Sequence, residues 1–379
     1  RHPVLLVGQS GCGKTQSANG MLKKLDSEVF CSTAINFNYY TDWAAVQGSL
    51  AAPVEKKAGR LYAPPGKLQL IYFLDDLNMC QLDKYNTQSA IAVLRQLHEY
   101  RHWWDMSKIT LKQIENTQYL ACMNPTAGSF VVNPRFQRHF WICSVPFPET
   151  QARQTIYTTF TQGHFQRLGF KPAVQEAIAS IVKTAMGLHD QVAQTFRKTA
   201  VNFHYEFNIR HLTGLFSGML KARPKEFTSP EKIVLLWLHE SERVYGDRLV
   251  SWSDLQKYRF LASETAKKMF GKYNFQRYFQ DKSPEPLVFA PFSHGHQEEP
   301  CYDQIHGFDE LSRLLIAALN DYNETFASME LVLFEDALRH VAKITRVIRN
   351  SSGHCLLVGV GGSGRQSLSR LGAFVGECQ

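Results

Sequence analysis

Short, mostly apolar runs divide the first 150 residues of the chain. They are bounded by glycine, proline or charged residues: VLLV at 4–7, LQLIYFLDDLN at 68–78, TQYLACMNP at 117–125 and FWICSVP at 140–146. Runs without polar alternation are typical of strands buried on both faces of a parallel sheet. We therefore predict an α/β region over residues 1–150. An insertion at 103–118, WWDMSKITLKQIENTQ, is expected to form a β-hairpin.

A helical periodicity replaces the apolar runs after residue 150. Apolar residues recur at spacings of three and four, which indicates helices, at 174–189, 207–220, 231–250, 308–323 and 331–350. The segment 271–306 is rich in Pro and His and is too irregular for long helices. An apolar run, HCLLVGV at 354–360, is expected to form one more strand. These patterns predict a helical part at 151–270, a connector at 271–306 and a further element group at 307–379.

Composition narrows the class of protein. The formal charge is +8, but Lys and Arg are dispersed and are not interleaved with stacking aromatics, so we expect no nucleic-acid partner. No apolar run has the 18 residues that a membrane span needs, so we expect no membrane contact. The eight cysteines form no CxxC pair, which is typical of a reduced intracellular protein. The chain begins without Met or a signal segment, so we expect it to be a piece of a longer protein.

The first apolar run leads into a glycine-rich loop of the form GxxxxGK[ST]. The loop consists of Gly8, Gln9, Ser10, Gly11, Cys12, Gly13, Lys14 and Thr15. Such a loop between a strand and a helix turns backbone N–H groups toward a polyphosphate, and its glycines allow close approach. Lys14 would neutralise the β- and γ-phosphates, and the Thr15 hydroxyl would bind Mg²⁺. The loop therefore predicts a nucleotide site.

Polar residues at the ends of later strands are candidates for chemistry at this loop. Asp75 is the candidate metal ligand and Asp76 stands where a catalytic Glu is usual. Asn124 would orient water, unless it is a turn residue before Pro125. Three arginines would face a nucleotide, unless they form local salt bridges or lie on an ordinary surface: Arg135, Arg138 and Arg210.

A second glycine-rich loop departs from the same pattern at two positions. It consists of Gly359, Val360, Gly361, Gly362, Ser363, Gly364, Arg365 and Gln366. Arg365 keeps the positive charge of the usual Lys, but Gln366 lacks the hydroxyl that binds Mg²⁺. We expect a site that holds ADP or ATP with a poorly held metal, with residues 331–334 as an adenine wall. A glycine-rich turn that serves packing alone is the alternative.

The order of these features resembles an AAA+ module, and several strings are similar to dynein heavy-chain motor rings: FLDDLNM, ACMNPTAGSFVVNPRFQRHF, FNIRHLTGLFSG, RVYGDRLV, LVLFEDALRHV and LLVGVGGSGRQSLSRL. The similarity covers nearly the whole chain. The second loop resembles the fourth ring module of axonemal dyneins, so residues 1–270 are similar to the third. The implied fold is an α/β P-loop NTPase module, a parallel sheet flanked by helices, with a helical lid and the start of the next module.

The resemblance also implies a role for each candidate residue. Gly8–Thr15 corresponds to the Walker A loop, Asp75 and Asp76 to the Walker B acids, Asn124 to the first sensor and Arg210 to the second. Arg135 or Arg138 corresponds to an arginine finger inserted into the preceding module's site. Because Asp76 replaces the usual Glu, hydrolysis is expected to be slow or absent.

The implied function is regulation of a minus-end-directed microtubule motor that drives ciliary or flagellar beating. ATP or ADP and Mg²⁺ are the implied cofactors, and the axonemal cytoskeleton is the implied location. The implied partners are neighbouring AAA+ modules of the same heavy chain and, through parts outside this fragment, dynein intermediate and light chains and microtubules. A permanently nucleotide-bound structural module without turnover is the alternative.

Overall fold

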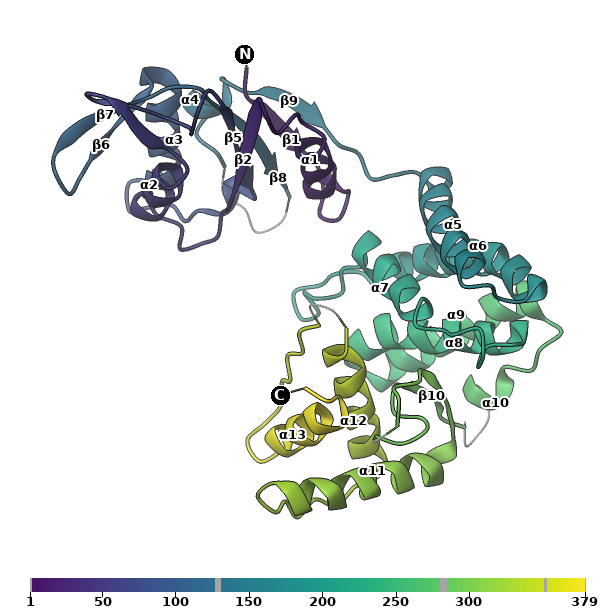
Figure 1. Ribbon diagram of the computed structural model, residues 1–379. Helices are drawn as coiled ribbons and strands as arrows, with labels where there is room; N and C mark the ends of the chain where they lie inside the picture. Colours follow the sequence, from purple (N-terminus) through teal and green to yellow (C-terminus); the bar gives the residue numbers. More distant parts are fainter. Residues whose placement is uncertain (1, 127–130, 280–284, 297, 351–352, 379) are drawn as a thin grey trace. The chain divides into compact units, whose positions relative to one another are not determined.

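The computed structural model describes residues 2–126, 131–279, 285–296, 298–350 and 353–378. They form two compact units, Arg1–Pro148 and Glu149–Gln379, each of which is described by itself. Figure 1 shows that the first unit contains the larger sheet, whereas the second consists mainly of helices. The predicted division between an α/β region and a helical region at residue 150 lies within two residues of this boundary.

A five-stranded parallel sheet forms the centre of the first unit. Its strand order is β2 (Phe30–Asn36), β5 (Gln69–Asp75), β8 (Thr117–Met123), β1 (Val4–Val7) and β9 (Trp141–Ser144). Four of these strands confirm the predicted apolar runs. Strand β2 was not predicted, because its sequence FCSTAIN sets apolar and polar residues in pairs and contains no continuous apolar run.

Side chains alternate between the two faces of this sheet and fix which helices cover each face. Tyr72 and Leu74 belong to the hydrophobic cluster that includes residues of α2 (Trp43–Ala51), α3 (Ser89–Tyr100) and α4 (Pro134–Gln137). Phe73 belongs to the other cluster, with Ala18 of α1 (Lys14–Leu22). This period of two places helices on both faces of the sheet, as predicted.

The predicted hairpin is present and belongs to a second, smaller sheet. Strands β6 (His102–Asp105) and β7 (Thr110–Ile114) pair antiparallel. The sheet is completed by β4 (Leu61–Ala63) and β3 (Glu55–Ala58), in the order β3-β4-β7-β6. Those two strands are short and were not predicted.

Long helices build the second unit around one large hydrophobic cluster. They are α5 (Thr150–Arg167), α6 (Pro172–Thr195), α7 (Ile209–Met219), α8 (Pro230–Val244) and α9 (Trp252–Phe270). The short helix α10 (Gln276–Phe279) and the antiparallel pair β10 (Leu287–Ala290) and β11 (Asp303–His306) follow. Three more helices complete the unit, α11 (Gly307–Thr325), α12 (Glu335–Ile348) and α13 (Arg365–Val375). Of the described helices, none combines the length and the apolar character of a membrane-crossing segment.

Two sequence predictions near the second loop are wrong. Residues 354–360 form no strand, and Leu356, Val358 and Val360 are each at least 80% exposed. A strand of a parallel sheet is stabilised by its neighbours, and no described strand pairs with this segment. Helix α12 begins at Glu335, not at residue 331, because Glu335 and Asp336 suit the positive end of a helix better than the apolar residues before them.

A buried ion pair joins α8 to α12 inside the second unit. The Glu240 carboxylate is fully buried, and it accepts hydrogen bonds from the Arg346 guanidinium and the Tyr302 hydroxyl. Burial alone would raise the pKa of Glu240, but the charge of Arg346 outweighs it and holds this pKa below its usual range. The carboxylate is therefore fixed in place.

A glycine beside this carboxylate gives a test of the packing. A Cβ added at Gly218 would overlap the Glu240 side chain, whereas a Cβ at Gly187, in the interior of α6, would meet nothing within 4 Å. We expect Gly218→Ala to lower the free energy of unfolding by about 1–3 kcal/mol. We expect Gly187→Ala to raise it by about 0.5–1 kcal/mol, because alanine favours a helix. Urea unfolding of both variants tests this, and equal effects of the two would contradict the packing described.

Candidate functional site

The first glycine-rich loop connects β1 to α1 and is held at its base. The Gly8 N–H donates to the Met123 carbonyl at 3.3 Å, and the Val145 N–H donates to the Val7 carbonyl at 2.7 Å. A Cβ at Gly8 would collide with the Val145 carbonyl oxygen. Gly11 and Gly13 have φ values of 80° and 93°, a region in which residues with side chains are strained. The loop therefore requires its glycines for this path.

Lys14 is folded back into the loop. Its side chain is 7% exposed, and its Nζ donates to the Gly8 and Gln9 carbonyls, both at 2.8 Å. The Cys12 Sγ lies 3.6 Å from the same nitrogen. Lys14 is also the first residue of α1, where unpaired backbone N–H groups and the helix dipole favour an anion. The loop thus gathers an ammonium and a helix N-terminus at one place.

The two predicted metal ligands lie together although they are far apart in the sequence. The Thr15 hydroxyl donates to the Asp75 carboxylate, at 3.0 Å to Oδ2 and 3.2 Å to Oδ1. The Asp76 N–H donates to Asp75 Oδ1 at 3.2 Å and orients the same carboxylate. A hydroxyl and a carboxylate are the hard oxygen ligands that Mg²⁺ prefers. The donor set beside Lys14 therefore fits a magnesium–phosphate complex.

The turn that carries Asp76 is tied to the end of the neighbouring strand. Asp76 is exposed and lies in the left-handed region at φ 54°, which Asp tolerates better than most residues. Two residues later Asn78, 3% exposed, donates its Nδ2 to the Asn124 carbonyl at 2.8 Å. Asn78 was not among the predicted site residues. Its only signal in the sequence is a polar residue two positions after the two acids.

The Asn124 side chain takes part in a turn. Its Oδ1 accepts from the N–H and the hydroxyl of Thr126, both at 3.1 Å. This is the turn interaction left open as the alternative for Asn124. The residues that follow, 127–130, lie outside the described part of the chain. A role in orienting water stays a prediction.

The three candidate arginines have different surroundings. Arg138 forms an ion pair with Glu99 at 3.2 Å, as in the local salt-bridge alternative. Arg135 is exposed and has no side-chain hydrogen bond or ion pair with any residue that the structure describes. Arg210 is exposed on the first turn of α7 in the second unit, where Asn208 caps the helix. Its role as a second sensor stays a prediction.

The second loop has the backbone conformation of the first. Gly362 and Gly364, with φ values of 76° and 72°, take the places of Gly11 and Gly13. The Ser363 N–H donates to the Val360 carbonyl at 3.4 Å, and the Cys12 N–H donates to the Gln9 carbonyl at the same distance. Helix α13 begins at Arg365 as α1 begins at Lys14. The two loops therefore differ in side chains and share a fold.

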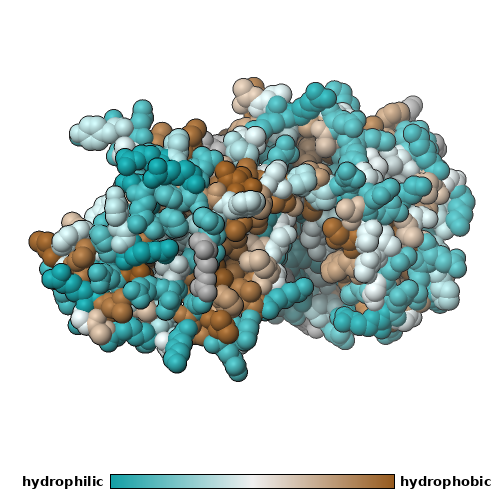
Figure 2. Space-filling model, turned by 90° about the horizontal axis from the view of Figure 1, so that it is seen from above, coloured by the Kyte–Doolittle hydropathy of each residue, from teal (hydrophilic) through white to brown (hydrophobic). Residues whose placement is uncertain are grey.

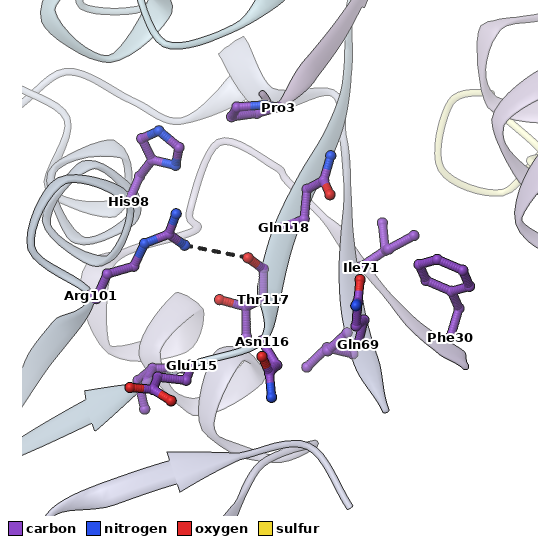
Figure 3. A pocket seen from close by; sticks show the side chains of 12 residues that line it. Pro3, Phe30, Gln69, Ile71, His98, Arg101, Glu115, Asn116, Thr117 and Gln118 are labelled. Atoms are coloured by element: carbon purple, nitrogen blue, oxygen red, sulfur yellow. Dashed lines mark hydrogen bonds between the residues drawn. The ribbon is translucent and has the colours of Figure 1, made fainter. Parts of the chain in front are cut away.

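Another cavity in the first unit lies away from these groups. It has a volume of about 280 Å³ and is lined where strands begin, at Pro3, Phe30, Gln69 and Thr117. Figure 3 shows it, with Arg101 donating to the Thr117 carbonyl at 3.4 Å. Asp75 lies at the other end of its strand, at the carboxyl edge where parallel sheets bind ligands. This cavity is not part of the site at the glycine-rich loop.

A parallel sheet flanked by helices, with a lysine-bearing loop after β1 and a carboxylate at the end of β5, defines a P-loop nucleotide-binding module. Comparison with known families agrees along the chain. Residues 1–148 match the model of the P-loop containing dynein motor region, and residues 181–278 match the AAA+ lid domain. Residues 329–379 match the P-loop containing dynein motor region D4.

Individual relatives are similar over nearly the whole chain. The dynein alpha chain of the flagellar outer arm of Chlamydomonas reinhardtii is 51% identical over 99% of this chain. Dynein axonemal heavy chain 11 of Sus scrofa is 43% identical over 98%, and the ciliary dynein beta chain of Tripneustes gratilla is 41% identical over 100%. This chain spans 8% of the length of each of the three.

The chain belongs to the axonemal dynein heavy chains and is part of their motor region. Its location in the cell is therefore the axonemal cytoskeleton. Membership of the P-loop dynein motor domains implies nucleotide binding, typically with Mg²⁺.

Proposed function

We propose that the first loop binds ATP or ADP with Mg²⁺ and regulates the motor ring through the occupancy of this site. The observation that carries the proposal is the contact between Thr15 and Asp75 beside the buried Lys14. Thr15 and Asp75 would hold the metal, which when bound neutralises phosphate charge. Lys14 and the N–H groups of the loop bind the phosphate oxygens.

We also propose that the chain is the third module of the ring and the beginning of the fourth. The match of residues 329–379 to the D4 region supports this assignment. The large subdomain would then be 1–150, the lid 151–270, the connector 271–306 and the start of the next module 307–379. Microtubule-based movement, and contacts with intermediate and light chains, are proposed for the whole heavy chain.

Neighbouring modules of the same heavy chain are the proposed direct partners. Large hydrophobic side chains are exposed in both units, among them Trp141 at 69% and Phe160 at 53%. Figure 2 shows brown hydrophobic patches among hydrophilic side chains on one face of the molecule. Patches of this kind are expected where a part packs against other parts. Arg135 is the proposed finger toward the preceding module, because Arg138 is held by Glu99.

A structural role without turnover is the alternative function. In that case nucleotide would stay bound at the first loop and hold the module in shape. A nucleotide-exchange measurement on the purified heavy chain separates the two. Release within the time of a motor cycle supports regulation, and nucleotide that never exchanges supports the structural role.

Lys14→Ala tests the assignment of the first loop. We expect this change to abolish ATP binding at the first loop, because it removes the ammonium at the centre of that loop. Lys23→Ala, at the far end of the same helix, is the control and should bind as the unchanged protein does. Isothermal calorimetry gives both affinities. A folded Lys14→Ala protein with unchanged affinity would show that the loop is not the site.

Asp76→Glu tests the expectation of slow turnover. Asp is one methylene shorter than Glu, and a displacement of about 1 Å from the attacking water costs on the order of a hundredfold in rate. We expect Asp76→Glu to speed hydrolysis at this site in the assembled ring. Asp76→Asn, which also tolerates the left-handed backbone, should not. If the wild-type protein already hydrolyses ATP at the first loop as fast as at the main ATP-hydrolysing site of the motor ring, the expectation is wrong.

The second loop gives a prediction about metal dependence. Gln366 replaces the hydroxyl residue, while the loop backbone is that of the first loop. We expect nucleotide occupancy at the second loop to be nearly the same with and without Mg²⁺, and occupancy at the first loop to fall when Mg²⁺ is removed. Gln366→Thr should make the second loop Mg²⁺-dependent. A density map of the intact ring with a metal ion bound directly to Gln366 would contradict this account.

A further inference from the structure

Three sets of contacts hold the short helix α4, which carries Arg135. Asn133 caps its first turn, with Oδ1 accepting from the Arg135 N–H at 2.9 Å. Phe136 is fully buried and packs edge-on against Phe140, with ring centroids 4.9 Å apart. A helix of four residues has little stability of its own, so these contacts and the one that follows determine its position.

The third set of contacts is made by the carboxylate of Glu99 at the end of α3. Its Oε1 binds Arg138 at 3.2 Å and His139 Nε2 at 3.0 Å, and its Oε2 binds Arg95 at 2.5 Å. The hydrogen bond from His139, followed by the charges of Arg95 and Arg138, holds the pKa of Glu99 below its usual range. The side chain is 12% exposed. One carboxylate thus links α3 to the end of α4.

The His139 ring is also packed from its other side. The His98 ring lies 4.8 Å from it between centroids. Burial first, and then the neighbouring His139 and Arg101, lower the pKa of His98 to about 4, so His98 is neutral at cellular pH. His139 therefore contacts a neutral ring, tilted by 52° to its own, while its Nε2 faces Glu99. The segment after α4 has little freedom to move.

From this arrangement we infer that Glu99 is a positioning residue for Arg135. Glu99 binds Arg138 and His139, which follow α4. Arg135 lies between these two residues and the capping residue Asn133, and its side chain has no partner among the described residues. The inference rests on the proposed function of Arg135 as a finger. It adds that the finger is effective because Glu99 fixes the helix that carries it.

The test compares Glu99→Gln with Arg135→Ala in the full heavy chain. Arg135→Ala shows which rate depends on the finger, that of nucleotide release or that of ATP turnover. Glu99→Gln keeps the shape of the side chain and removes its charge. We expect it to change the same rate in the same direction, by about tenfold to a hundredfold, as for a displacement near 1 Å. The double variant should be no worse than Arg135→Ala alone, because a misplaced finger and an absent finger fail in the same way.

Controls separate a positioning role from a general loss of structure. Glu55→Gln removes a carboxylate from another ion pair of the first unit, Glu55–Lys57, and should leave that rate unchanged. His139→Gln removes the 3.0 Å contact between His139 and Glu99 by changing the other residue of the pair. It is tested in place of Glu99→Gln if that variant unfolds. If Arg135→Ala changes neither rate, the proposed role of Arg135 as a finger is wrong. If Arg135→Ala has an effect and Glu99→Gln has none, or their effects add, the positioning role is wrong.

Discussion

The hydrogen bond between Thr15 and Asp75 depends on the order of strands in the parallel sheet. Strand β8 pairs with β1 on one side and β5 on the other, so the carboxyl ends of all three lie at one edge. The glycine-rich loop follows β1, Asp75 ends β5 and Asp76 follows it, and Asn124 follows β8. Residues from distant parts of the sequence meet there because parallel strands all end on the same side. The roles proposed for Lys14, Thr15 and Asp75 at the first loop depend on this arrangement.

The two glycine-rich loops separate what a backbone provides from what side chains provide. Glycines with positive φ at equivalent positions give both loops the same backbone course up to the N-terminus of the following helix. That path is enough to bind an anion. Metal binding needs the hydroxyl and the carboxylate that the first loop has at Thr15 and Asp75, and Gln366 supplies no such hydroxyl. Two substitutions can therefore change the chemistry of a site without changing its fold.

The sequence was sufficient to predict the features that local patterns determine. Strands buried on both faces are continuous apolar runs, and the loop motif gives its own geometry. Strand β2 was not predicted because its apolar residues stand in pairs separated by polar ones and form no continuous run. Residues 354–360 were wrongly predicted as a strand because an apolar run gives no information about its neighbours. The contacts of Asn78 and Glu99 join residues 46 and 40 positions apart, and no local pattern indicates them.

The second unit shows how a glycine-rich loop can be joined to a helical part. The α13 helix starts at the second loop and packs closely on α12, since a Cβ at Gly372 would lie 2.7 Å from the Ile344 side chain. Helix α12 is in turn bound to α8 by Arg346 and Glu240. Breaking one partner of a buried pair is costly because the other charge is left uncompensated. The ion pair and the close packing therefore connect α8, α12 and α13 in series, and the last of these helices begins at the second loop.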